Sequence, residues 1–153
     1  HGNGTQDAFY TDPSVFFLSL HQSPHYPGTG AADQRGAGEG IGYTMNVPLP
    51  AGTSRSDYLA SFEGAWDEVM ERFAPDFVLM SAGFDVMAGD PLGDQLLEPE
   101  DLHRITRRVV DAARDTCDGK VVALLEGGYN PRRLGEGAVA VIRALAGLEA
   151  ETG

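Results

Sequence analysis

Two aspartates, Asp85 and Asp90, follow a short apolar run at residues 77–80 and lie in a loop that contains glycine and proline. A continuous apolar run of this length predicts a strand buried on both faces. Ligands of open parallel α/β sheets bind beyond the carboxyl ends of the strands, so a carboxylate in this loop is well placed for chemistry. The pattern by itself favours a simpler interpretation, in which each aspartate caps a helix or closes an Asx-turn.

Two other apolar runs, residues 15–18 and 121–125, end in the same way. The first continues into the polar string SLHQ, and the second continues into the glycine-containing string EGGYN. Because all three runs are followed by polar or glycine residues, the sequence predicts that one crevice collects the three loops. The histidines of the loop 21–30 are candidate ligands or acid–base groups, although a loop histidine such as His25 is more often solvated.

Amphipathic helices alternate with these runs and are predicted to position them. Apolar residues recur at helical spacing over 59–73, 102–112 and 134–148. From residue 54 onward the predicted order is helix, strand, helix, strand, helix, which is typical of parallel α/β layers. Residues 1–14 are predicted to form turns. His103 lies off the apolar stripe of its helix and is predicted to be exposed.

Composition excludes several classes of protein. The 153 residues suit a single domain, and the formal charge of −12, from 11 basic and 23 acidic residues, disfavours nucleic acids and anionic membranes as partners. Cys117 is the only cysteine, which excludes an intrachain disulfide and a thiolate zinc cluster and favours a cytoplasmic protein. No apolar run reaches transmembrane length, and no signal peptide is visible.

Five strings, in this order along the chain, resemble motifs of the histone deacetylase family: HGNGTQDAFY, SLHQSPHYPGTG, GEGIGYTMNVPLPAG, SAGFDVMAGDPLGD and LEGGYN. The resemblance is to the bacterial branch related to acetylpolyamine amidohydrolases and acetoin-utilisation proteins. It implies an arginase/deacetylase-like three-layer α/β fold with a mainly parallel sheet that is incomplete at its amino-terminal side. Residues 1–153 would be the carboxyl-terminal part of a single deacetylase domain.

The resemblance also implies roles for single residues. Asp85 matches a zinc ligand, and Tyr129 matches the catalytic tyrosine whose hydroxyl hydrogen-bonds the developing oxyanion. The positions that match the walls of an acyl-lysine tunnel are Tyr26, Leu92, Gly127 and Gly128. The positions that match a potassium site near the zinc are Ser19 and Leu20, and those that match a second potassium site are Phe9, Asp12, Val15 and Tyr43.

The chain departs from the family pattern at its first residue. The family string is Asp-x-His-His-Gly, and His1 precedes Gly2, so His1 matches the second histidine, which is not a ligand. The Asp-x-His ligand pair and the histidines that serve as general base would precede His1. The chain therefore carries one of three expected zinc ligands, at Asp85, together with Tyr129.

These observations leave three hypotheses. The first is a zinc-dependent deacylase of acetyl-lysine or acetylated amines that is inactive as this partial chain. The second is a non-catalytic pseudoenzyme fragment that binds a partner, such as its missing amino-terminal half or another copy of itself. An arginase-like manganese ureohydrolase is disfavoured because the Asp85 loop contains no Asp-x-Asp.

The family mechanism has a geometric consequence. Asp85 and Tyr129 must face one crevice, which should also receive Tyr26 and Leu92 from their separate loops. If Asp85 only caps a turn, no particular spatial relation between Asp85 and Tyr129 is expected. In addition, a parallel sheet that lacks part of its fold should expose apolar surface.

Overall fold

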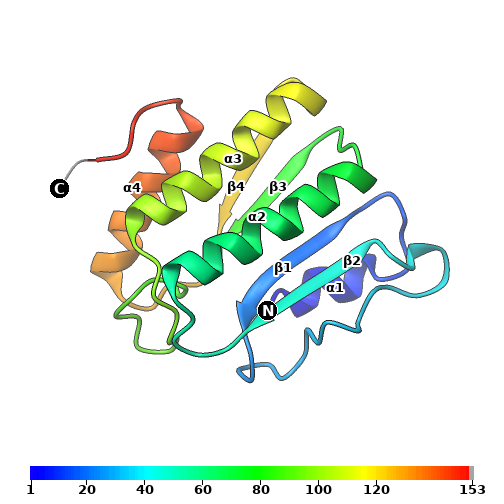
Figure 1. Cartoon of the computed structure of the whole chain (residues 1–153), viewed down its shortest axis with the longest axis horizontal. Helices are drawn as coiled ribbons and strands as arrows, with labels where there is room; N and C mark the ends of the chain where they lie inside the picture. The colour runs from blue at the N-terminus through cyan, green and yellow to red at the C-terminus, as the bar shows by residue number, and fades with distance from the viewer. Residues whose placement is uncertain (152–153) are drawn as a thin grey trace.

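The computed structural model describes residues 1–151, which form an α/β arrangement of parallel strands and helices (Figure 1). The elements in chain order are α1 (Asn3–Phe9), β1 (Phe17–Gln22), the 3-10 turn η1 (Gly38–Gly40), β2 (Thr44–Leu49), α2 (Arg55–Arg72), β3 (Val78–Ala82), α3 (Pro99–Cys117), β4 (Val121–Leu125) and α4 (Pro131–Leu145). From α2 to α4 the order agrees with the predicted helix, strand, helix, strand, helix.

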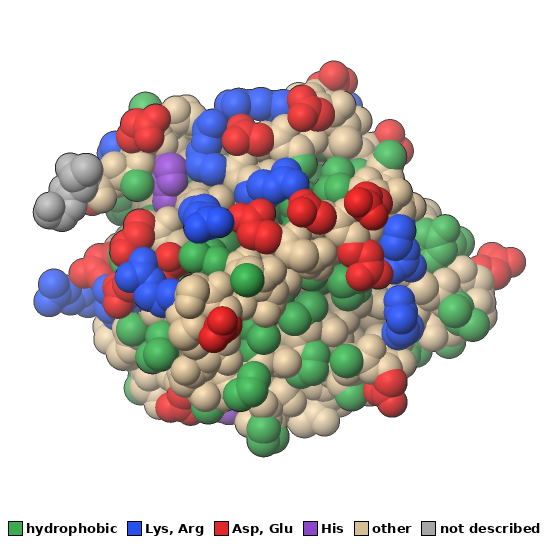
Figure 2. Space-filling model, in the orientation of Figure 1, with side chains coloured by type: hydrophobic (Ala, Val, Ile, Leu, Met, Phe, Trp, Pro, Cys, Tyr) green, Lys and Arg blue, Asp and Glu red, His purple; other side chains and the backbone are tan. Residues whose placement is uncertain are grey.

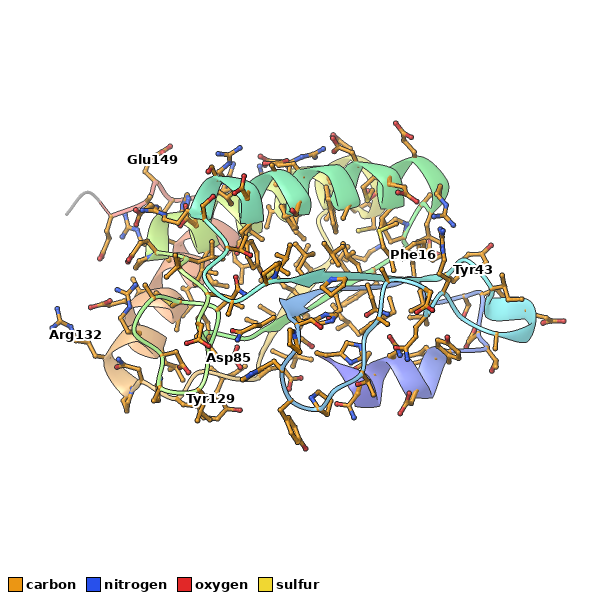
Figure 3. The ribbon with its side chains drawn as sticks, turned by 60° about the horizontal axis from the view of Figure 1, so that its bottom comes forward. Phe16, Tyr43, Asp85, Tyr129, Arg132 and Glu149 are labelled. Atoms are coloured by element: carbon orange, nitrogen blue, oxygen red, sulfur yellow. The ribbon has the colours of Figure 1, made fainter. Side chains whose placement is uncertain are left out.

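The strands form two parallel pairs. β1 pairs with β2, with Phe17 opposite Thr44, and β3 pairs with β4, with Val78 opposite Val121. Among the described residues each pair is a separate two-stranded sheet. Helices lie on both sides of the strands, with α2 (green) above them and α1 (blue) below them in Figure 3. The predicted α/β fold class with parallel strands is confirmed.

A shared core unites the two strand pairs. Phe62 and Trp66 of α2 stack with ring centroids 6.0 Å apart and pack with residues of α3 into one buried cluster. Leu18 of β1 and Val78 of β3 both pack against this cluster, so both sheets contact the same helices. A second cluster is centred on Met87, in the loop after β3, and includes Phe84, Leu97, Leu102 and Val141. The loop that carries Asp85 is therefore anchored in the core.

The outer face of α2 and α3 carries alternating acidic and basic side chains (Figure 2). Arg108 of α3 contacts both Glu63 and Asp67 of α2, at 3.4 Å and 2.6 Å. All of these side chains are partly or largely exposed, so each pair contributes little to stability on its own. Among the described residues, no helix is long and apolar enough to cross a membrane.

The opposite face of β3 and β4 is apolar and uncovered within residues 1–151. Leu79 is 68% exposed, and Val122 and Leu124 are also exposed. Within residues 1–151 the run 77–80 is therefore buried on one face only, whereas burial on both faces was predicted. The helices cover only the face that carries Val78 and Met80. The expectation of exposed apolar surface is confirmed.

Several local predictions need correction. Residues 3–9 form α1 although turns were expected; α1 has no side-chain cap, and its one buried residue, Gln6, ties it to the strands. His103 is buried rather than exposed, because the chain after α4 returns over it and the Leu148 carbonyl lies 2.8 Å from His103 Nε2. His21 lies in β1 rather than in a loop.

Truncating Met87 should destabilise the fold strongly. Its side chain is fully buried, so Met87→Ala leaves a cavity and should lower the free energy of unfolding by about 2–5 kcal/mol. Urea unfolding measures this loss. Leu96→Ala, at a partly exposed position nearby, is the control and should cost much less. Equal losses in both variants would contradict the assigned core.

Candidate active site

Hydrogen bonds join the loops that follow β1, β3 and β4. Gln22, at the end of β1, exchanges two bonds with Asp94: its Nε2 donates to Asp94 Oδ2 at 3.1 Å, and its Oε1 accepts from the Asp94 N–H at 2.8 Å. The Phe84 N–H donates to the Gly127 carbonyl at 2.9 Å, just beyond β3 and β4. The predicted convergence of the three loops is therefore present in the structure.

The Asp85 side chain lies against the backbone of Gly127. A Cβ atom added at Gly127 would overlap Asp85 Oδ2, and one added at Gly83 would lie 2.9 Å from Asp85 Oδ1. Only glycine leaves space for the carboxylate at residue 127. Gly127 was predicted to line a substrate tunnel, but its contact in this chain is with the predicted metal ligand.

Asp85 is half-buried, and burial raises the pKa of its carboxyl group. A hydrogen bond with its own backbone opposes this shift, whereas the nearby charge of Asp90 adds to it. Burial is the largest of these effects, so among the described residues the ionised carboxylate of Asp85 is poorly compensated.

Tyr129 lies at the same edge of the molecule as Asp85 (Figure 3). It follows Gly128, whose φ of 126° is a conformation that residues with a side chain rarely adopt. The Tyr129 ring is 55% exposed, and its backbone N–H donates to Asp90 Oδ2 at 2.7 Å. Asp85 and Tyr129 thus occupy neighbouring loops at the carboxyl ends of β3 and β4. That their side chains face one crevice stays a prediction.

Tyr26 and Leu92 are exposed side chains on the two flanking loops. Tyr26 lies in the loop after β1, four residues beyond Gln22. Leu92 lies in the loop after β3, and its N–H donates to Asp90 Oδ1 at 2.9 Å. Both residues lie at the carboxyl ends of the strands, and their predicted contact with a substrate stays a prediction.

The described residues cannot by themselves complete a zinc site. Within residues 1–151 no group of three His, Cys, Asp or Glu side chains is arranged to hold a metal ion. A tetrahedral zinc site needs three or four protein ligands, and Asp85 supplies one. The residues present therefore fit one part of such a site.

The residues predicted for two potassium sites lie in separate places. Ser19 and Leu20 are in β1, and Ser19 Oγ lies 3.0 Å from His21 Nδ1. In the other set, Phe9 ends α1, Asp12 and Val15 lie in the connection to β1, and Tyr43 directly precedes β2. Figure 3 places Tyr43 at the far end of the strands from Asp85. The Ser14 hydroxyl donates to Asp12 and lowers the pKa of that carboxyl group. Cation binding at either place stays a prediction.

A buried polar network was not predicted. His21 Nε2 lies 2.9 Å from the Gly30 carbonyl, and burial lowers the pKa of the His21 ring. Gln6 Oε1 accepts from Asn46 Nδ2 at 2.7 Å and lies 3.0 Å from His1 Nε2. The two-residue period of a strand places Ser19 and His21 on one face, and this signal could have identified part of the network.

Comparisons with known proteins identify relatives along the whole chain. Residues 1–145 match the histone deacetylase domain. The chain is 44% identical over 151 residues to histone deacetylase 10, chloroplastic, of Oryza sativa subsp. japonica. The aligned region covers 96% of this chain and 33% of that protein.

Solved structures give the same result. The structure of the histone deacetylase Clr3 matches with a TM-score of 0.90 and 41% identity, over 99% of this chain and 26% of that chain. The acetylpolyamine aminohydrolase from Burkholderia pseudomallei matches with a TM-score of 0.86 and 33% identity. The match covers 97% of this chain and 42% of that chain. The chain spans less than half the length of each of these three proteins.

Replacing Asp85 should stabilise the metal-free chain at neutral pH. The pKa of Asp85 in the folded chain lies above its ordinary value of 3.8, so between these two pH values the folded state binds more protons than the unfolded state. Stability contributed by this group therefore falls as pH rises through that window. Asp85→Asn should be more stable than the parent chain at pH 7, and the difference should shrink as pH falls toward 3.8.

Urea unfolding with a chelator present, at several pH values, measures this difference. Asp94→Asn, which neutralises an exposed carboxylate in the same loop, is the matched control and should show a smaller effect. An Asp85→Asn variant that is less stable than the parent at pH 7 would contradict the assigned burial.

Proposed function

The chain belongs to the histone deacetylase family, and from this premise we propose that residues 1–153 are the carboxyl-terminal part of a zinc-dependent deacylase domain. The proposed reaction is hydrolysis of acetyl-lysine or of acetylated amines. We propose further that this chain needs the rest of the domain for activity, because it holds one of three zinc ligands.

The main support is the position of Asp85 beside the loop that carries Tyr129. The Asp85 carboxylate lies against Gly127, two residues before Tyr129, and Asp90 binds the Tyr129 N–H. Residues 44 positions apart in the chain are thereby held at one edge of the strands. A turn-capping aspartate and an unrelated surface tyrosine would not require this arrangement.

Each proposed catalytic residue has a separate task. A zinc ion bound in part by Asp85 would supply a Lewis acid for the acetamide carbonyl. The Tyr129 hydroxyl would donate a hydrogen bond to the oxyanion as negative charge develops on the carbonyl oxygen. The general base would come from polypeptide outside these residues.

Substrate would enter beside the exposed side chains of Tyr26 and Leu92. An aromatic ring and an aliphatic side chain suit the methylene chain of an acyl-lysine or an acylated polyamine. The formal charge of −12 would attract an acylated polyamine through the ammonium groups that remain unacylated. In the same proposal, Ser19 and Leu20 contribute to a potassium site near the zinc. Phe9, Asp12, Val15 and Tyr43 contribute to a second one.

The partner of the uncovered sheet face would be the remainder of the deacetylase domain. The relatives extend well beyond the part that this chain matches, and each of the four strands has one unpaired edge among the described residues. Apolar residues such as Leu79 and Leu124 would pack beneath that additional polypeptide. Without it, copies of the chain are expected to associate.

A second candidate function is a non-catalytic binding module. The single metal ligand and the exposed apolar face both favour it for the chain on its own. The two candidates differ in whether addition of the rest of the domain produces hydrolysis that depends on Tyr129.

The isolated chain should not hydrolyse an acetyl-lysine peptide with zinc added, because one carboxylate does not hold a catalytic zinc ion. Expression with the rest of its domain should produce hydrolysis. In that form Tyr129→Phe should lower kcat by about 10²–10³, the usual effect of removing one oxyanion donor. Release of acetate measures turnover.

Tyr10→Phe, at the end of α1 and away from the Asp85 edge, is the matched control and should leave turnover unchanged. Turnover by the isolated chain that Tyr129→Phe abolishes would contradict the need for outside ligands. Turnover of the complete domain that survives Tyr129→Phe would contradict the role of Tyr129.

The isolated chain should sediment as a species larger than a monomer, because the apolar face of β3 and β4 is uncovered. The double variant Leu79→Ser and Leu124→Ser should shift the chain toward monomer and reduce binding of an apolar dye. Ile142→Ser, at an equally exposed position on α4, is the control and should change neither measurement. A compact monomer that binds little dye would contradict this prediction.

A further inference from the structure

We propose that Asp90 is a positioning residue that fixes Tyr129 and the Leu92 segment relative to Asp85. This inference rests on the proposed function. Asp90 is 8% exposed, and its carboxylate accepts three backbone hydrogen bonds. The donors are Tyr129 N–H at 2.7 Å to Oδ2, Leu92 N–H at 2.9 Å to Oδ1, and Gly93 N–H at 3.2 Å to Oδ1.

The two oxygens of Asp90 have different tasks. Oδ1 closes the turn of its own loop and thereby places Leu92 at the rim of the crevice. Oδ2 crosses to the loop after β4 and holds the backbone of Tyr129. A carboxylate that accepts N–H groups forms stronger bonds than a neutral acceptor, so the connection between the loops is firm.

Other forces on Tyr129 are weak. Its ring is 55% exposed, so packing does not fix its orientation. Gly128, directly before it, has a φ of 126° and permits many backbone conformations. The hydrogen bond to Asp90 is therefore the direct restraint on the backbone of Tyr129 itself. A hydroxyl that must meet an oxyanion within about 3 Å needs such a restraint.

Replacing Asp90 should not unfold the chain, because other bonds join the same two loops. Asn130 Nδ2 donates to the Gly89 carbonyl at 2.9 Å, and Arg133 Nε donates to the Ala88 carbonyl at 2.9 Å. Arg133 also contacts Glu98 and Glu136. These contacts hold the amino end of α4 against the loop and do not involve Asp90.

Asparagine separates the two tasks, since it has one acceptor oxygen and one NH2 donor. The oxygen of asparagine should accept from the two N–H donors of Leu92 and Gly93. The NH2 group should then face the Tyr129 N–H, which loses its acceptor. Asp90→Asn should therefore release Tyr129 alone. Asp90→Ala should release all three amides.

Amide hydrogen exchange, followed by NMR on this chain, tests the inference without any need for activity. In Asp90→Asn the exchange rate of the Tyr129 amide should rise by about tenfold or more, while Leu92 and Gly93 change little. In Asp90→Ala all three rates should rise. Asp94→Asn is the control for loss of one charge in this loop, and none of the three should change. A Tyr129 rate within twofold of the parent in both Asp90 variants would overturn the proposal.

Kinetics of the complete domain provide the second measurement. Asp90→Asn should lower kcat at least tenfold with KM changed less than twofold, whereas Asp90→Ala should alter both. A kcat that is unchanged in Asp90→Asn, despite fast exchange at Tyr129, would overturn the positioning role. If the complete domain hydrolyses no acetylated substrate, the proposed function fails, and the exchange pattern alone decides whether Asp90 fixes Tyr129.

Discussion

The candidate site depends on the continuation of the β3–β4 ladder beyond the strands. The Glu126 N–H donates to Ala82 O at 3.0 Å, and the Phe84 N–H donates to Gly127 O at 2.9 Å. These two bonds bring the backbone of Gly127 beside residue 85. The absence of a side chain at Gly127 then lets the Asp85 carboxylate lie against it. Asp90 and Tyr129 add one more bond farther along the same two loops. The site is thus an extension of the sheet's own hydrogen bonding.

This construction has an electrostatic cost. Asp85 is half-buried beside another aspartate, and its raised pKa shows that the ionised form is poorly compensated. The packing of Phe84 and Met87, which are buried before and after Asp85 in the chain, holds the loop in place despite this cost. A rigid support beneath an uncompensated carboxylate is what a metal-binding position requires.

Much of the fold is predictable from local signals. Ser54 caps α2, and prolines at the first positions of α3 and α4 mark where these helices begin. The placement of Asp85 and Tyr129 in neighbouring loops is also predictable, because both follow apolar runs at the same end of a parallel pair. The burial of His103, the helix at residues 3–9 and the bond from Asp90 to Tyr129 are not predictable in this way. Each depends on a contact between distant segments that leaves no periodic pattern. The separation into two sheets likewise reflects which strand edges find a partner, and composition carries no information about that.

The two strand pairs also determine how the chain can fold. Each pair joins strands that are consecutive in the sequence, β1 with β2 and β3 with β4. Each pair can therefore form without a strand from the other pair. Pairings between segments close in sequence form faster than distant ones, and such units open and close as separate cooperative blocks. We therefore expect two folding units that meet at the core between α2 and α3. During synthesis the β1–β2 pair can form before β4 has left the ribosome, with the segment after α2 as the junction between the two units.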